Sequence, residues 1–334
     1  MNDEQGRTLA TVKAIDAWYE HQEERPRPHL GCSLLGHPCE RYLWLSFRWA
    51  VREHFDGRQL RLFERGKREE RVFVDFLRNT GAVVSHTDAD SADEQLHVEL
   101  APHIGGSVDG IIESGLLEAP DVRHIAEFKT HNKKSFDELE KKGLYEAKRR
   151  HWCQMQCYML GTHIEHGFYM AVCKDDDRLY TERVSLDKRV AQMIVERGAR
   201  IVRAERMPQP LSADPSWYQC KMCGFWSFCH ETHLTKEINC RTCCHSTPTA
   251  QGTWRCEFHG RDMPYDVQVG GCFNHALHPD LVPWAFKGGD DTGACAVYEI
   301  DGQLIKNGCA EGAVQSRDLL AGKRTPPPLV SIPF

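Results

Sequence analysis

The sequence has no long apolar run. No stretch of about 18 or more apolar residues occurs in its 334 residues, so it predicts no membrane-spanning helix. Its first residues, Met1-Asn-Asp-Glu-Gln5, are polar and acidic, unlike a secretory signal peptide. We therefore expect a cytosolic protein without a membrane partner.

An excess of positive charge and a phosphate-binding glycine loop are also missing. The chain has 42 Lys and Arg residues against 48 Asp and Glu residues, giving a formal net charge of −6. This balance excludes a polycation that coats nucleic acid, but it leaves room for a local basic track. No internal repeat and no G-x4-G-K-[ST] motif occur, so the sequence contains no recognisable nucleotide-driven motor.

What the sequence does contain predicts an α/β fold. The apolar periodicity predicts helices over 8–22, near Cys39 and over 59–79, 134–162 and 186–206, and strands within 82–129, 165–173 and 178–184. This order favours a central mixed β-sheet flanked by helices.

The last third of the chain differs in composition. From about residue 236 it is rich in Cys, Gly and Pro, with a hairpin predicted over 296–306 that turns at Asp301-Gly302. The Pro-rich tail over 325–334 is expected to be extended or to act as an interaction strand. We therefore predict three parts: a large domain over 1–235, a small zinc-binding module over 236–285, and a hairpin with a tail over 286–334.

Two predicted strands carry charged residues among apolar ones. Asp109 lies in one of them, and Glu127 and Lys129 lie in the other. Residues two apart on a strand point to the same side, so Glu127 and Lys129 project together. Two carboxylates and an ammonium could hold a hard divalent cation with a phosphate beside it. A buried salt bridge with an aspartate in a turn is the alternative that these residues leave open.

The predicted helix over 59–79 adds a third carboxylate. Its apolar arc consists of Leu62, Phe63, Phe73, Val74 and Leu77. At 100° per residue, Glu70 falls near the middle of that arc and Glu69 at its edge. A buried acid is costly without a cation, so Glu70 is the better ligand candidate, unless both are surface acids. Gln154 and Tyr158 share one face of a later helix and suit contacts to a nucleotide.

Four motifs in this order resemble the PD-(D/E)xK nuclease superfamily, and within it the RecB-like branch. They are Gly66…Glu70, Gly106-Ser-Val-Asp109, Glu127-Phe-Lys129 and Gln154-x3-Tyr158. The resemblance covers about residues 30–235, with Val108 standing where the family often has proline. It implies a restriction-endonuclease-like core and a metal-dependent DNA exonuclease.

The same resemblance implies roles for single residues. Asp109, Glu127 and the carbonyl of Phe128 would bind Mg²⁺ or Mn²⁺, and Glu70 would complete the site directly or through water. Lys129 would orient or help to deprotonate the attacking water and offset charge on the scissile phosphate. Gln154 and Tyr158 would hold the DNA.

The compact, motor-free form resembles phage-type recombination or DNA-processing nucleases. We therefore expect linear DNA, single- or double-stranded, as the substrate and a single-strand annealing or replication protein as a partner. The compartment would be the cytosol of a bacterium or of a phage-infected host. Two other functions stay open: a protein that binds DNA ends or partners on a nuclease fold without cutting, and an iron–sulfur redox sensor.

Fifteen cysteines in a reducing compartment point to metal rather than to disulfides. The Cys220-x2-Cys223-x5-Cys229 group, with Cys39-Glu-Arg41 before the core, resembles the iron–sulfur nucleases, namely the AddB nuclease domain and the CRISPR adaptation exonucleases. The resemblance implies a [4Fe–4S] cluster on Cys39, Cys220, Cys223 and Cys229 that joins the start of the domain to its end. Cys32 could replace Cys39, and tetrahedral zinc on the same thiolates is the alternative.

A second group of cysteines lies in the predicted zinc module. Cys240-x2-Cys243 has the spacing of a zinc knuckle, and Cys256 and Cys272 complete a set of four thiolates. His275 could replace one of them. Because this part of the chain has few apolar residues, we expect Zn²⁺ to supply much of its folding free energy.

Overall fold

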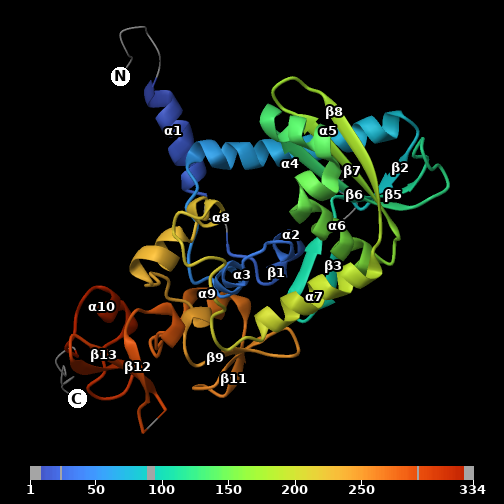
Figure 1. Cartoon of the computed structure of the whole chain (residues 1–334). Coiled ribbons are helices and arrows are strands. Elements are labelled where there is room, and N and C mark those ends of the chain that lie inside the picture. The colour runs from blue at the N-terminus through green and yellow to red at the C-terminus, as the bar shows by residue number, and fades with distance from the viewer. Residues whose placement is uncertain (1–8, 23–24, 89–94, 292, 327–334) are drawn as a thin grey trace. The chain divides into compact units, whose positions relative to one another are not determined.

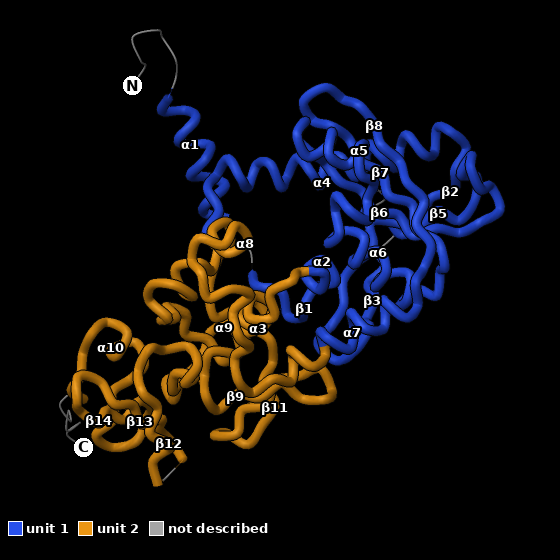
Figure 2. The backbone as a smooth tube through the Cα atoms, in the orientation of Figure 1, with its two compact units in different colours: residues 1–36, 54–198 blue, residues 37–53, 199–334 orange. Residues whose placement is uncertain are grey.

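The computed structural model describes residues 9–22, 25–88, 95–291 and 293–326 (Figure 1). The chain divides into two compact units, coloured separately in Figure 2. The first consists of residues 1–36 and 54–198, and the second of residues 37–53 and 199–334. The predicted domains 1–235, 236–285 and 286–334 stay a prediction. Residues 37–53 and 199–235 belong to the same unit as the cysteine-rich last third of the chain.

The first unit contains most of the long helices and strands. Its helices are α1 (Leu9–Glu20), α2 (Cys32–Leu35), α4 (Gly57–Asn79), α5 (Lys133–Ala147) and α6 (Arg149–Thr162), and α7 (Lys188–Val202) begins in it. Its strands are β1 (Leu30–Gly31), β2 (Val83–Ser85), β3 (His97–Ala101), β4 (Ile104–Ser107), β5 (Gly110–Ser114), β6 (His124–His131), β7 (His166–Cys173) and β8 (Leu179–Ser185). These elements confirm the helices and strands predicted between residues 59 and 206.

A five-stranded sheet with the order β2-β5-β6-β7-β8 forms the centre of this unit. Strands β6 and β7 run parallel, whereas the other neighbouring pairs run antiparallel. Helix α4 packs on β2 and β6, while α5 and α6 pack on β6 and β7. The predicted α/β class with a mixed sheet flanked by helices is therefore confirmed. A smaller sheet has the order β1-β4-β3.

Helix α4 shows how the sequence sets one wall of the core. It begins with a capping box between Asp56 and Gln59 and ends at Asn79, before Gly81 with its positive φ of 97°. Its buried residues Phe73, Val74 and Leu77 join a core cluster with Phe128 of β6 and other residues of the sheet. The prediction that Phe63 belongs to the buried arc is wrong, because Phe63 is 49% exposed. The core contacts of α4 are confined to its C-terminal half.

The second unit is built from short elements. Its helices are α3 (Glu40–Phe47), α8 (Tyr218–Lys221), α9 (Tyr265–Gly270) and α10 (Ser316–Leu320), with a π-helical turn η1 (Phe228–Thr232) and 3₁₀ turns η2 (Cys240–Thr242) and η3 (Pro279–Leu281). Its strands are β9 (Ser246–Pro248), β10 (Trp254–Cys256), β11 (Arg261–Met263), β12 (Ala285–Gly289), β13 (Cys295–Ile300) and β14 (Gln303–Gly308).

These six strands form two antiparallel sheets, β11-β10-β9 and β12-β13-β14. The predicted hairpin is confirmed: β13 and β14 pair through Ile300 and Gln303, and the turn residues Asp301 and Gly302 have φ of 52° and 78°. The predicted extended tail over 325–334 lies almost wholly outside the described residues. None of the helices in the described ranges is both long and apolar enough to cross a membrane.

Candidate active site

The predicted acidic residues meet where the start of β5 pairs with the middle of β6 in the first unit. Asp109 lies between β4 and β5, and β5 pairs with β6 through Gly110 and Ala126, next to Glu127. The backbone N–H of Phe128 donates to Oδ2 of Asp109 at 2.8 Å. The antiparallel register of β5 and β6 therefore brings Asp109 next to the Glu127-Phe128-Lys129 triplet.

The two strand motifs supply three of the predicted metal ligands: Asp109, Glu127 and the carbonyl of Phe128. The ammonium of Lys129 contacts all three. It donates to the carbonyl of Phe128 at 2.8 Å and to Oδ2 of Asp109 at 3.4 Å, and it forms an ion pair with Oε1 of Glu127. The Glu127 side chain is fully buried, whereas the side chains of Asp109 and Lys129 are 11% and 27% exposed. One positive charge thus lies among oxygens from three residues.

Burial of these acids changes their protonation. Burial raises the pKa of Glu127 to about 8, although Lys129 opposes the shift. Burial also raises the pKa of Glu70 to about 7, and the nearby Asp109 carboxylate adds to it. Burial alone would lower the pKa of Lys129, but Asp109 and Glu127 outweigh it and raise that pKa above its ordinary value. Without a divalent cation, the site therefore holds protons at neutral pH.

The structure brings Glu70 to this site, as its position on the predicted helix suggested. It shares a face of α4 with the buried Phe73 and Val74 and lies near enough to Asp109 and Lys129 for their charges to affect it. Oε2 of Glu127 has no hydrogen-bond partner among the described residues. A buried carboxylate oxygen without a donor suits a cation ligand, since such a group is costly when nothing contacts it.

Gln154 and Tyr158 are both buried on one face of α6. Nε2 of Gln154 donates to the hydroxyl of Tyr158 at 3.4 Å. Burial, with Glu127 as the next cause, raises the pKa of Tyr158 above its ordinary value. The Tyr158 hydroxyl lies against Gly106 of β4, where a Cβ atom would come within 2.7 Å of it. The pair is therefore next to the Asp109 motif, and its contact with DNA stays a prediction.

A hydrogen-bonded group beside Lys129 was missed by the sequence reasoning. The hydroxyl of Tyr169 bonds Nε2 of His131 at 2.8 Å and Nδ1 of His151 at 3.0 Å, and Tyr169 is paired with Glu127 in the β6–β7 register. Burial, followed by nearby lysines, lowers the pKa of His131 to about 4 and that of His151 well below its ordinary value. Both rings are therefore neutral at pH 7.

Strand and helix spacing could have found these histidines. His131 is two residues after Lys129 on β6, so the two side chains share a side of the strand. His151 is three residues before Gln154 on α6, so those two share a helix face.

Among the described residues, no group of three or more His, Cys, Asp or Glu side chains could hold a metal ion as they stand. At the acidic site, the ammonium of Lys129 lies among the oxygens that a cation would need. Metal ligation by Glu70, Asp109, Glu127 and Phe128 therefore stays a prediction.

No protein-family model matches the chain, and no curated protein sequence matches it. Solved structures give matches at low identity. The alkaline exonuclease LHK-Exo from Laribacter hongkongensis is 16% identical, with a TM-score of 0.39 over 57% of this chain and 90% of that chain. The crystal structure of LHK-Exo in complex with dAMP gives the same values. SSO0001 is 17% identical, with a TM-score of 0.40 over 66% of this chain and 96% of that chain.

A structural likeness of this size carries no conclusion about family or activity. The function proposed below therefore rests on the residues of the site themselves.

The four cysteines predicted to hold an iron–sulfur cluster line one cavity of the second unit. They are Cys39, Cys220, Cys223 and Cys229, and the cavity has a volume of about 30 Å³. Two backbone N–H groups point at sulfur: Tyr42 donates to Cys39 and Phe225 donates to Cys223, each at 3.4 Å. Such bonds favour thiolates that bind a metal. Cys32, the alternative to Cys39, is buried in the first unit.

Aromatic rings surround part of this cavity. Tyr42 stacks on Phe225 with ring centroids 4.7 Å apart, and Trp226 also lines the cavity. Trp217 is 44% exposed and does not line the cavity. Burial raises the pKa of Cys223 to about 11, so this thiol is neutral at pH 7 when no metal binds it.

The second predicted set also gathers at one place. Cys240, Cys243, Cys256 and Cys272 line a different cavity of the second unit, together with His275. Cys244 does not line this cavity and packs against a core cluster that includes residues of β13 and β14.

Proposed function

We propose that the chain is a divalent-metal-dependent deoxyribonuclease, an exonuclease that hydrolyses phosphodiester bonds in phage-type recombination or DNA processing. One observation carries this proposal. The Asp109 carboxylate, the Glu127 carboxylate and the Phe128 carbonyl all contact the single ammonium of Lys129. These oxygens are hard ligands of the kind that Mg²⁺ and Mn²⁺ prefer, and the ammonium marks where positive charge is stabilised among them.

Some residues of the site would bind the cation, and Lys129 would act on the phosphate or the attacking water. When bound, Mg²⁺ or Mn²⁺ supplies a Lewis acid that stabilises phosphate charge and lowers the pKa of water. Asp109, Glu127 and the Phe128 carbonyl would hold the cation, with Glu70 next to them. With those carboxylates neutralised, the ammonium of Lys129 is available to offset charge on the scissile phosphate or to orient the attacking water.

The substrate side of the proposal rests on α6. Gln154 and Tyr158 offer an amide and a hydroxyl close to Asp109, and both groups suit contacts to a phosphate or base. A single-strand annealing or replication protein is the partner we propose.

Cleavage of linear and covalently closed circular DNA, with Mn²⁺ or Mg²⁺ added to the full chain, tests the proposal. We expect degradation of linear DNA only, and its loss in Lys129→Met and Asp109→Asn. Glu70→Gln and Glu69→Gln form a matched pair on α4: the first should cut activity by at least about a hundredfold, the second by less than about twofold. Equal cleavage by wild type and Lys129→Met, or cleavage by neither, would refute the proposal.

We further propose that Cys39, Cys220, Cys223 and Cys229 hold a [4Fe–4S] cluster with a structural role. It would join residues 37–53 to residues 199–235 within the second unit, two segments far apart in the sequence. The test is iron and sulfide analysis after anaerobic purification. We expect both elements in wild type and neither in Cys229→Ser. Zinc without iron in wild type would replace the cluster with tetrahedral zinc on the same thiols.

A further inference from the structure

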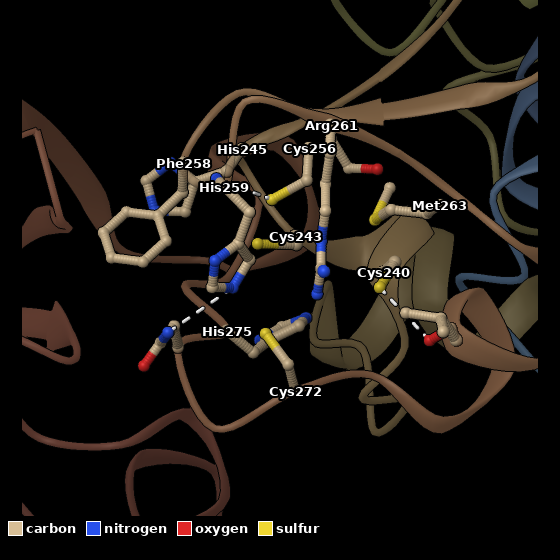
Figure 3. Close-up of a pocket in the computed structure, with 13 residues that line it drawn as sticks. Cys240, Cys243, His245, Cys256, Phe258, His259, Arg261, Met263, Cys272 and His275 are labelled. Atoms are coloured by element: carbon tan, nitrogen blue, oxygen red, sulfur yellow. Dashed lines mark hydrogen bonds between the residues drawn. The ribbon is translucent and has the colours of Figure 1, made fainter.

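Figure 3 shows the cavity that is lined by the second set of cysteines. Cys240 begins η2 and Cys243 follows it, Cys256 ends β10, and Cys272 lies just after α9. The cavity has a volume of about 50 Å³. A cavity that holds one water needs roughly 10–15 Å³, so this cavity has room for a single cation.

The backbone around these cysteines has the form of metal-binding turns. The N–H of Cys243 donates to the carbonyl of Cys240 at 3.2 Å, closing a tight turn across the Cys-x2-Cys pair. The N–H of His275 closes a matching turn on the carbonyl of Cys272 at 3.3 Å. The N–H of His259 donates to Sγ of Cys256 at 3.4 Å. The first of these turns brings two of the four ligands together, and an N–H group aimed at sulfur favours a thiolate at Cys256.

His275, the alternative ligand, is already engaged at both ring nitrogens. Its Nδ1 bonds the hydroxyl of Ser316 at 2.9 Å, and its Nε2 bonds the hydroxyl of Thr242 at 3.1 Å. The side chain is 2% exposed, so turning it toward a metal would leave buried hydroxyls without partners. This favours Cys272 over His275 as the fourth ligand.

We propose that Cys240, Cys243, Cys256 and Cys272 bind one Zn²⁺ ion in a tetrahedral site. Each thiol would lose its proton to solvent on binding. As the side chains stand, the described residues do not converge on one point, so binding requires the thiols to turn about their Cα–Cβ bonds. Soft thiolates select Zn²⁺ over Mg²⁺ or Mn²⁺, which keeps this site apart from the acidic one.

Arg261 supports a site of this charge. It lines the same cavity, and Figure 3 shows its side chain among the four cysteines. Four thiolates around one divalent cation leave a net negative charge, which the guanidinium of Arg261 would offset in part.

The zinc would join the two sheets of the second unit. Strands β9, β10 and β11 have three residues each, too short to be stable alone. The segment after Cys272 is bonded on both sides: Cys244 N–H donates to the carbonyl of Ala276 at 2.8 Å, and Leu277 N–H donates to Oδ1 of Asn307 on β14 at 2.7 Å. A metal that fixes Cys272 therefore also fixes the link between the small sheet and β14.

Zinc analysis of the full chain, purified without added metal and dialysed against a weak chelator, tests the site. We expect about one Zn²⁺ per chain in wild type and at least about tenfold less in Cys256→Ser and Cys272→Ser. His275→Gln should keep its zinc. Cys309→Ser is the control, because Cys309 is exposed and does not line the cavity. Zinc retained in both Cys256→Ser and Cys272→Ser would overturn the assignment. So would zinc that is kept in Cys272→Ser but lost in either Cys309→Ser or His275→Gln.

A second measurement guards against variants that fail to fold. Wild type with Co²⁺ in place of zinc should show the intense visible bands and sulfur-to-cobalt charge transfer of a tetrahedral thiolate site. The absence of both zinc and these bands in wild type would overturn the proposal. Loss of iron and sulfide together in Cys256→Ser would also overturn it. Because neither readout depends on DNA cleavage, failure of the zinc site and failure of the nuclease proposal are distinguishable.

Discussion

The affinity of the acidic site for Mn²⁺ should rise steeply with pH. Burial raises the pKa of Glu127 to about 8 and that of Glu70 to about 7, against an ordinary value of 4.5. Below its pKa, each carboxyl carries a proton that the cation has to displace, so the affinity falls as the pH falls. Above both pKa values no proton is displaced, and the affinity becomes constant.

The two pKa values set the size of this effect. If both carboxyls bind the cation only when ionised, the affinity rises about 50-fold from pH 6 to pH 7 and about tenfold from pH 7 to pH 8. The total between these limits is about 500-fold, with only about a twofold rise from pH 8 to pH 9. Carboxyls with ordinary pKa values would change the affinity by less than about 10% over the whole range.

Free aqueous Mn²⁺ can be measured by electron paramagnetic resonance in an anaerobic titration of the full chain. Glu70→Gln removes the step near pH 7, so about 50-fold should remain between pH 6 and pH 8. Glu69→Gln, on the same turn of α4, should keep the full rise. Asp109→Asn reports any Mn²⁺ bound elsewhere on the chain.

Two results would refute this reasoning. A wild-type affinity that changes by less than about threefold between pH 6 and pH 8 would mean that neither raised pKa belongs to a metal ligand. The same pH dependence in wild type and Glu70→Gln would remove Glu70 from the site but leave Glu127 in it.

Three further predictions concern stability. Without a divalent cation, the folded state holds the protons of Glu127 and Glu70 more tightly than the unfolded chain, so stability should fall as the pH rises from about 5 to about 8. Thermal unfolding across this range measures the fall, which saturating Mn²⁺ should abolish; a rise would contradict it. Tyr169→Phe should cost about 1–3 kcal/mol in urea unfolding, because it removes the hydroxyl that bonds the rings of His131 and His151; an unchanged midpoint would count against that network. Gly106→Ala should cost about 1–3 kcal/mol, because its Cβ would lie 2.7 Å from the Tyr158 hydroxyl. The cost should shrink in a Tyr158→Phe background, whereas additive costs would show that the two residues do not meet.

Local patterns predicted most of the secondary structure of the first unit. The strands at 166–173 and 179–185 and the helix ending at Asn79 lie where apolar periodicity and turn residues indicated them. The hairpin at Asp301-Gly302 was equally local, because the required positive φ values favour these residue types. The prediction that Phe63 is buried was wrong. Phe63 lies on the apolar arc of the helix, but only the C-terminal half of α4 contacts the core.

The sequence by itself determined which residues are the candidates for chemistry. Strand alternation placed Glu127 and Lys129 on one side, helix phase separated Glu70 from Glu69, and cysteine spacing indicated two thiol groups. Such inferences depend on neighbours within a few residues, where backbone geometry fixes direction.

Only the tertiary structure decided which of these groups meet. It placed Cys39 in one unit with Cys220, Cys223 and Cys229, and it engaged both ring nitrogens of His275. It also set the ammonium of Lys129 among three oxygens and buried Glu127 until its pKa rose to about 8. Contacts between residues far apart in the chain depend on how its elements pack, and burial depends on everything packed around a side chain. Neither can be found from the spacing of residues in a sequence.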